Sequence, residues 1–297
     1  MKILLSSLKF SRVMARPTQI SSSKCFEGLQ NVYEHDSKEL GCKMKFSVFF
    51  PSAASQPNVK LPVVYYLSGL TCTEQNMITK SGIQRYAEEN KLIIVGPDTS
   101  PRKCDVPGEE DSWDIGTGAG FYVDATREPW KKNYRMYSYV SKELPQLVNS
   151  SFDSVDSIRV GITGHSMGGH GALICFFKNP TIYKAVTAFA PISNPMKSSW
   201  GVKCFKEYLG DNQEAWKEYD ATELVKKNPR KDTKIIVEQG AEDEWLSHLV
   251  PKNFVEACKE ANQPLEYNER KGYDHGYFFV STFIESHMKH FAKELTK

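Results

Sequence analysis

Residues 158–172 read IRVGITGHSMGGHGA, and this stretch decides the fold class. An apolar run at 158–163 predicts a strand, and a helical pattern follows Gly164-His165-Ser166-Met167-Gly168. A Gly-x-Ser-x-Gly turn between a strand and a helix is typical of a nucleophile elbow, which holds a serine clear of the sheet. Small residues leave room for the tight bend. We therefore expect Ser166 to be a nucleophile; a serine that only caps the helix is the alternative.

Strand and helix signals alternate on both sides of this turn. Short apolar runs predict strands at residues 44–50, 63–67, 92–95, 158–163, 185–190, 235–238 and 265–268. Longer stretches predict helices at 80–90, 133–149, 167–178, 251–262 and 277–295. Several apolar runs are continuous, as expected when helices cover both faces of a parallel sheet. The pattern predicts an α/β fold with a mainly parallel central sheet, and a strandless helical insertion at 195–230.

Length and composition narrow the class of protein further. The chain has 297 residues, 40% of them hydrophobic, which is ordinary for a globular protein with a sizeable core. The net charge of +2 gives no electrostatic case for a nucleic-acid partner. The longest apolar runs are too short to span a membrane. We therefore predict a single α/β domain over residues 17–297.

The first sixteen residues differ from the rest of the chain. Residues 1–16 are serine-rich and basic, and the first acidic residue is Glu27. This composition resembles a mitochondrial presequence, and an untargeted extension is the alternative. The seven cysteines are odd in number and form no CxxC pair, which suits reduced thiols in the cytoplasm and suggests no metal site. The sequence therefore predicts a cytoplasmic protein, with mitochondrial targeting as a second option.

A serine nucleophile needs a base and an orienting carboxylate, which follow in the order Ser, Asp, His in hydrolases with this elbow. Asp243 lies in the loop at the carboxyl end of the strand predicted at 235–238 and is favoured as the acid. Glu242 and Glu244 flank it and remain rivals. The other downstream aspartates are expected at the surface, at helix caps or pointing away from the site: Asp211, Asp220, Asp232 and Asp274.

His275 is favoured as the base, because it lies in the loop between the last predicted strand and the last helix. His248 follows Asp243 closely and remains a weaker candidate. Core, surface or packing roles are expected for His170, His287 and His290. His165 adjoins the nucleophile, but neighbouring elbow residues point elsewhere, so a structural role is expected for it.

The oxyanion of the reaction needs two backbone donors. Met167 begins the helix after the serine, and its N–H is one expected donor. Leu70, in the loop after an early strand, is the other. Cys72 lies beside Leu70 and is expected either in the acyl pocket or as a buried apolar residue.

Five blocks of sequence resemble the S-formylglutathione hydrolase family, also called esterase D. They are residues 68–76 (SGLTCTEQN), 97–102 (PDTSPR), 116–126 (GTGAGFYVDAT), 164–172 (GHSMGGHGA) and 272–275 (GYDH). The resemblance implies an α/β-hydrolase fold, a homodimer, no metal or organic cofactor, and hydrolysis of S-formylglutathione to glutathione and formate. It also implies a triad of Ser166, Asp243 and His275, and places Trp200 near the pocket. The stretch AEDEW at 241–245, and Gly276 where a serine is usual, depart from the family pattern.

Two other functions remain to be distinguished. A general carboxylesterase acting on small acyl esters would use the same triad. A hydrolase-fold protein that binds without turnover would commonly lack a triad member, whereas all three are present here.

Overall fold

The computed structural model describes residues 15–297. The residues before them, which carry nearly all of the basic extension, lie outside the described part, so the presequence expectation stays a prediction. Within 15–297, no helix is both long and apolar enough to cross a membrane.

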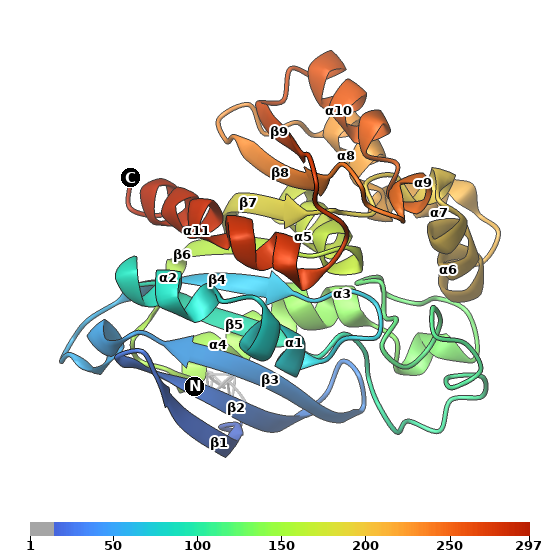
Figure 1. Cartoon of the computed structure of the whole chain (residues 1–297). Coiled ribbons are helices and arrows are strands. Elements are labelled where there is room, and N and C mark those ends of the chain that lie inside the picture. Colours follow the sequence, from blue (N-terminus) through green and yellow to red (C-terminus); the bar gives the residue numbers. More distant parts are fainter. Residues whose placement is uncertain (1–14) are drawn as a thin grey trace, which may run out of the picture.

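A nine-stranded sheet forms the centre of the described chain, in the order β1-β2-β3-β5-β4-β6-β7-β8-β9 (Figure 1). Strands β4 to β9 run parallel to one another. Strands β1, β2 and β3 pair antiparallel in series, and β3 pairs antiparallel with β5. The strands are β1 (Thr18–Cys25), β2 (Gly28–Ser37), β3 (Cys42–Phe50), β4 (Leu61–Leu67), β5 (Ile93–Pro97), β6 (Val155–Gly164), β7 (Tyr183–Phe189), β8 (Ile235–Gly240) and β9 (Leu265–Arg270). This confirms the expected α/β architecture with a mainly parallel sheet.

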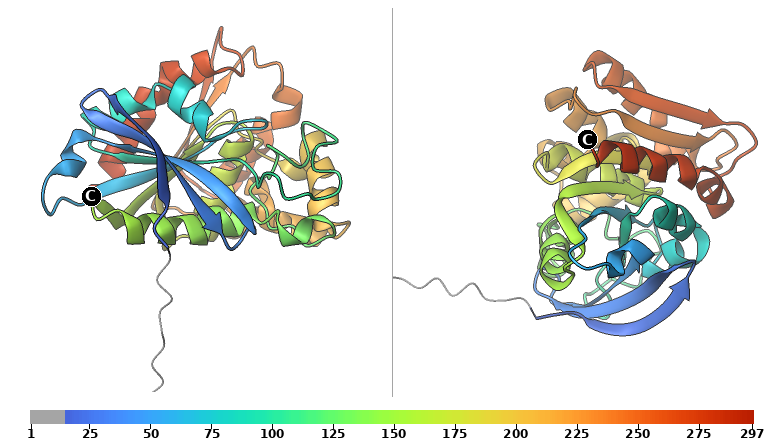
Figure 2. Two further views of the ribbon diagram at one scale, coloured as in Figure 1. Left: turned by 90° about the horizontal axis from the view of Figure 1, so that it is seen from below. Right: turned by 90° about the vertical axis from the view of Figure 1, so that its left-hand side faces the viewer.

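Helices cover both faces of the sheet (Figure 2). On one face lie α1 (Glu74–Lys80), α2 (Ile83–Glu89) and α11 (Tyr277–Glu294), which contact one another. On the other lie α4 (Leu144–Ser151), α5 (Met167–Lys178) and α8 (Ala221–Lys227), with α10 (Pro251–Glu260) packed on α8 and β9. Strands β4, β5 and β8 are buried along their whole length because both of their faces are covered.

The predicted insertion is helical and lies above the carboxyl ends of the strands, except for α8, which packs against α5 on the face of the sheet. It contains α6 (Ser199–Leu209), α7 (Gln213–Trp216) and α8, and the short helix α9 (Leu246–Leu249) follows β8. Figure 1 shows α6 and α7 beside the long loop between β5 and α3 (Met136–Ser138). Together they form a raised rim at this end of the sheet.

Two strands and two helices differ from the sequence prediction. Strands β1 and β2 were not predicted, because β1 is exposed and polar and β2 buries polar side chains such as Gln30 and Asn31. The single helix predicted at 133–149 is instead α3, a π-helical turn at Tyr139–Glu143, and then α4. The helix predicted at 80–90 is α2 alone, with α1 before it.

Three histidines are buried in this fold in their neutral form. His165, His170 and His287 are almost or fully buried. Burial lowers the pKa of His170 to about 4, and the pKa values of His165 and His287 lie well below the ordinary range for the same reason. Each of these rings therefore stays neutral in the folded protein.

We expect the free energy of unfolding to fall in mild acid. A histidine with a lowered folded pKa takes up its proton only on unfolding, so its contribution is intact above the ordinary value of 6.5 and is lost as the pH falls from there towards about 4. His170 alone should account for about 2 kcal/mol at pH 5, from its shift of pKa. Urea unfolding across this pH range measures the effect. A His170→Gln variant should show a shallower pH dependence, and a flat wild-type profile would contradict the prediction.

Candidate active site

The elbow after β6 holds Ser166 in a strained conformation. Its φ of 59° and ψ of −119° lie in a region that non-glycine residues rarely adopt. The strain is held by hydrogen bonds from the Ser166 N–H to the Phe189 carbonyl (2.9 Å) and from the His165 N–H to the Leu67 carbonyl (3.0 Å). The side chain therefore projects at the carboxyl end of the sheet, as the motif predicts.

Glycines flank the serine because the backbone is crowded there. A Cβ at Gly164 would lie 2.2 Å from the Gly168 carbonyl oxygen, and one at Gly168 would lie 2.0 Å from the Leu67 carbonyl oxygen. No other residue fits at either position without moving the main chain. The sequence motif is thus a steric requirement of the turn.

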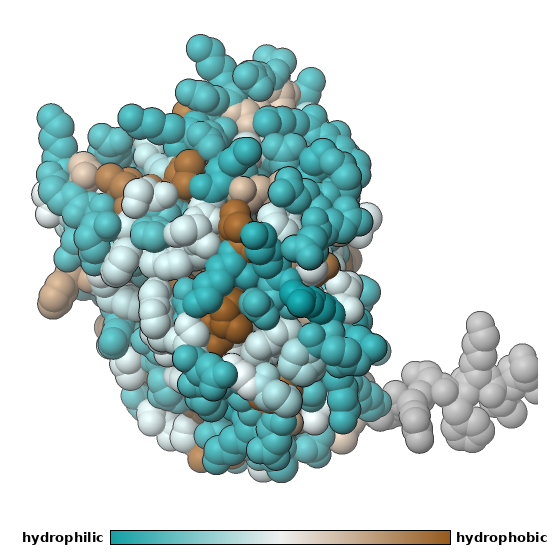
Figure 3. All heavy atoms as spheres, turned by 90° about the vertical axis from the view of Figure 1, so that its right-hand side faces the viewer, coloured by the Kyte–Doolittle hydropathy of each residue, from teal (hydrophilic) through white to brown (hydrophobic). Residues whose placement is uncertain are grey.

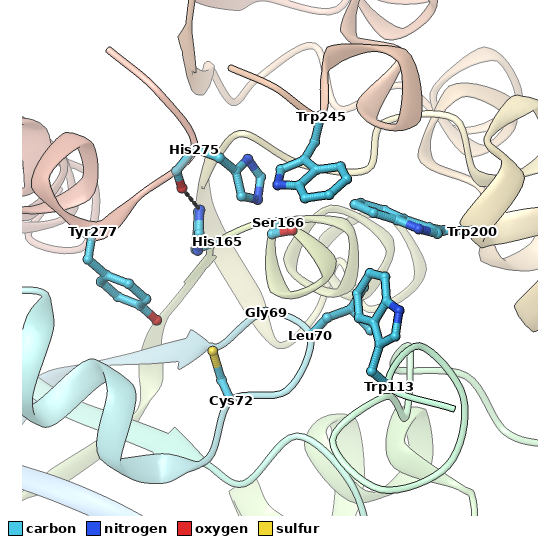
Figure 4. A pocket seen from close by; sticks show the side chains of 10 residues that line it. All are labelled: Gly69, Leu70, Cys72, Trp113, His165, Ser166, Trp200, Trp245, His275 and Tyr277. Atoms are coloured by element: carbon cyan, nitrogen blue, oxygen red, sulfur yellow. Dashed lines mark hydrogen bonds between the residues drawn. The ribbon is translucent and has the colours of Figure 1, made fainter. Parts of the chain in front are cut away.

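His275 and Asp243 form a hydrogen-bonded pair beside the serine. The distance from His275 Nδ1 to Asp243 Oδ2 is 2.7 Å, and the Asp243 side chain is fully buried. Because a carboxylate accepts, Nδ1 carries the hydrogen and Nε2 of the neutral ring is left as an acceptor. Ser166 and His275 line the same cavity, where Figure 4 shows the imidazole next to the serine side chain. The structure thus brings the three expected triad residues together.

The rival acids and bases lie elsewhere. Glu242 and Glu244 are exposed. His248 bonds the Ser199 hydroxyl through Nδ1 (2.7 Å) and stacks on Trp200. The other candidates take up helix caps, turn contacts or the interior: Asp220 caps α8, Asp274 accepts from the Gly276 N–H, and His170, His287 and His290 are buried.

The loop after β4 runs close against the elbow. A Cβ at Gly69 would lie 3.1 Å from the Ser166 Cβ, so the chain approaches the nucleophile directly. Leu70 follows and lines the cavity. Met167 is the first residue of α5, where a backbone N–H has no partner within the helix. One expected donor thus lies on the loop that approaches the serine and the other on the first residue of the following helix, and their role in holding the oxyanion stays a prediction.

The carbonyl of Cys72 fixes the far end of this loop. It accepts hydrogen bonds from Arg102 Nη2 (3.0 Å) and from the Thr99 hydroxyl. Arg102 is itself held by both carboxylate oxygens of Asp98, at 2.7 and 2.9 Å. The guanidinium of Arg102 is therefore engaged by the Asp98 carboxylate and the Cys72 carbonyl of the protein itself.

The cavity at the serine has a volume of about 150 Å³. Its lining residues are Gly69, Leu70, Cys72, Trp113, His165, Ser166, Trp200, Trp245, His275 and Tyr277. Figure 4 shows Cys72 and Tyr277 on one side of Ser166, and the three tryptophans on the other. Figure 3, which views the end of the molecule carrying this rim, shows a narrow hydrophobic strip within a mainly hydrophilic surface.

Both expected pocket residues line this cavity. Cys72 is buried, and burial raises the pKa of its thiol, so it is held as a neutral group. The Trp200 ring packs against Trp113 and Trp245, with centroids 5.6 and 5.1 Å away. Neither these two neighbours nor Tyr277 could be predicted from the sequence, because they lie on loops or at a helix start without a motif.

His165 corrects an expectation, because its ring also lines the cavity and does not point elsewhere. Its Nε2 lies 2.9 Å from the His275 carbonyl oxygen, and the two rings are 4.7 Å apart. Since a carbonyl only accepts, His165 donates through Nε2. The residue therefore ties the elbow to the loop that carries His275.

Residues 15–297 contain no group of three or more His, Cys, Asp or Glu side chains arranged to hold a metal ion. All seven cysteines are free thiols.

Comparison with known proteins agrees with this geometry. The Esterase family model matches residues 37–290. The chain is similar to the S-formylglutathione hydrolase of Bos taurus, with 59% identity over 279 residues that cover 93% of this chain and 98% of the relative. It is 51% identical to the S-formylglutathione hydrolase of Arabidopsis thaliana, over 94% and 98% of the two chains.

A solved structure supports the same assignment. The S-formylglutathione hydrolase of Agrobacterium tumefaciens superposes with a TM-score of 0.89 at 44% identity, covering 94% of this chain and 99% of that one. The sequence resemblance is thereby confirmed, and the fold is an α/β-hydrolase fold. The chain belongs to the S-formylglutathione hydrolase family.

Proposed function

We propose that the chain is a serine hydrolase that cleaves S-formylglutathione to glutathione and formate through a formyl-Ser166 intermediate. The observation that carries the proposal is the contact of His275 Nδ1 with Asp243 Oδ2 at 2.7 Å, in a cavity shared with a strained serine. Relatives that bear the name of this enzyme match nearly the whole chain. No metal or organic cofactor takes part in the scheme.

The first half of the reaction forms the acyl-enzyme. His275 Nε2 accepts the proton of Ser166 Oγ while Oγ attacks the formyl carbon. The buried Asp243 holds the ring in the required tautomer and stabilises the imidazolium. The C–S bond then breaks, and the sulfur of glutathione leaves with the proton from His275.

The second half releases formate. A water molecule gives a proton to His275 Nε2 and attacks the formyl ester of Ser166. Collapse of the second tetrahedral intermediate breaks the ester bond, and the serine recovers its proton. The N–H groups of Leu70 and Met167 stabilise the oxyanion in both halves, and one such donor is typically worth about 10²–10³ in kcat.

The cavity wall next to the serine leaves room for only a small acyl group. Gly69 runs close against the serine, and Cys72 lines the side of the cavity opposite the tryptophans. We assign Cys72 to the acyl side and Trp200 to the thiol side of the site. A formyl group has no methyl to accommodate, so a tight acyl side favours it over acetyl.

A comparison of three substrates tests this function. We expect kcat/KM to be highest for S-formylglutathione, and about tenfold or more lower for S-acetylglutathione, because one extra methyl in a tight site costs about 1–3 kcal/mol. p-Nitrophenyl acetate should also be a poor substrate. Equal or better activity on the two acetyl substrates would retain the serine chemistry and favour the general carboxylesterase instead.

The oligomeric state and compartment complete the proposal. The family resemblance supports a homodimer, which light scattering of the purified protein tests. Seven free thiols support a reducing compartment such as the cytoplasm.

A further inference from the structure

A buried glutamine, Gln239, donates a hydrogen bond to the carboxylate of Asp243. Gln239 is in β8 and is fully buried. Its Nε2 lies 2.9 Å from Asp243 Oδ2, the same oxygen that accepts from His275 Nδ1. The remaining oxygen, Oδ1, accepts from the Trp245 N–H at 2.8 Å. Asp243 is thus held by three donors from the strand, its own loop and the histidine.

The orientation of this amide follows from its neighbours. Besides the carboxylate, Nε2 lies 3.2 Å from the Gly240 carbonyl oxygen. Both neighbours only accept hydrogen bonds, so the NH₂ group must face them. The Gln239 Oε1 is then left buried without a partner among the described residues.

An unpaired buried oxygen is unfavourable for folding. An apolar side chain of similar length, such as methionine, would fill the same space without that cost. Packing alone therefore does not account for a glutamine here, whereas a requirement for its N–H donor does. We propose that Gln239 is a positioning residue: it holds Oδ2 of Asp243 in line with His275 and limits how strongly the carboxylate attracts the imidazolium proton. This inference rests on the proposed function.

The charged and titratable groups around the pair are few. His275 faces Asp243 and the neutral His165, and Cys72 and Tyr277 line the same cavity. Glu242 and Glu244 flank Asp243 but are exposed. Glu238 precedes Gln239 on β8 and is engaged by Arg270 and Asn268, with His287 at 3.9 Å. We therefore expect a change at Gln239 to alter the pH dependence of activity through its hydrogen bond to Asp243.

Gln239→Met removes the donor while filling the space. We expect kcat on S-formylglutathione to fall roughly tenfold, the usual range for losing a hydrogen bond to a charged group. KM should stay within about twofold, since Gln239 does not line the cavity. The acidic limb of the kcat/KM profile should move up by about one pH unit, because the less neutralised carboxylate favours protonated imidazole.

Gln263→Met is the matched control. Gln263 is also a buried glutamine, but its amide donates to the carbonyls of Arg230 and Thr233, away from the site. The Gln263→Met variant should have a lower free energy of unfolding, and the acidic limb of its kcat/KM profile should not move. An acidic limb that is unchanged in Gln239→Met, or one that moves equally in both variants, would overturn the inference.

The wild-type enzyme provides a second test that does not depend on folding of a variant. In protein labelled with ¹⁵N-glutamine, the side-chain NH₂ signal of Gln239 should titrate with the same midpoint as the acidic limb of activity. A signal that does not follow this midpoint overturns the inference. Failure of the proposed function is recognised separately, as wild-type protein that does not hydrolyse S-formylglutathione or as full activity after loss of the Ser166 hydroxyl.

Discussion

Ser166→Ala should lower kcat on S-formylglutathione by about 10⁴–10⁶, the range seen when serine hydrolases lose their nucleophile. The reason is that no acyl-enzyme can form and water must attack the thioester directly. The cavity and its backbone donors remain, so substrate should still bind with nearly unchanged affinity. Steady-state release of glutathione, with isothermal titration for binding, measures both quantities.

Ser193→Ala is the control for that experiment. Ser193 is also buried and follows a strand, but its hydroxyl donates to the Pro191 carbonyl at 3.0 Å and it does not line the cavity. Its activity should stay near wild type. Near wild-type turnover in Ser166→Ala would refute the mechanism.

Asp243→Asn should reduce kcat by about 10⁴, as loss of the acid does in other serine hydrolases. The asparagine side chain has one oxygen where the aspartate has two, and the Trp245 N–H and Gln239 both require an acceptor. With its oxygen towards Trp245, the new NH₂ group faces His275 Nδ1. The ring then takes the tautomer with hydrogen on Nε2 and has no lone pair for the serine proton.

Glu244→Gln tests whether any nearby carboxylate would serve. Glu244 adjoins Asp243 in sequence but is exposed. Its replacement should leave kcat within about twofold of wild type, since a change at an exposed position is usually small. A large loss there, with a mild effect in Asp243→Asn, would transfer the role to the flanking acid.

Much of the fold could be predicted because it depends on local pattern. Strands β4 and β5 are buried on both faces and are nearly continuous apolar runs, and the buried strand β8 begins with the apolar run Ile235–Val237. The elbow was recognisable because Gly164 and Gly168 are required sterically. Strand β1 gave no such signal, since its residues are exposed on both faces and polar.

The triad and the rest of the site differ in how far sequence determines them. Asp243 and His275 lie in the loops that follow strands β8 and β9, and the carboxyl ends of parallel strands meet at one edge of a sheet. Trp113 and Trp245 belong to irregular loops whose path depends on tertiary packing. Gln239 did leave a signal, since it is one of two polar residues, with Glu238, in a strand that is buried along its whole length.

The most direct test of the account is the identity of the acylated residue. Wild-type protein is mixed with S-formylglutathione, quenched in acid within the first turnover, digested and examined by mass spectrometry. We predict the added mass of one formyl group on the peptide that contains Ser166, and none in Ser166→Ala. A formyl group on Cys72, or turnover without any acylated peptide, would contradict it.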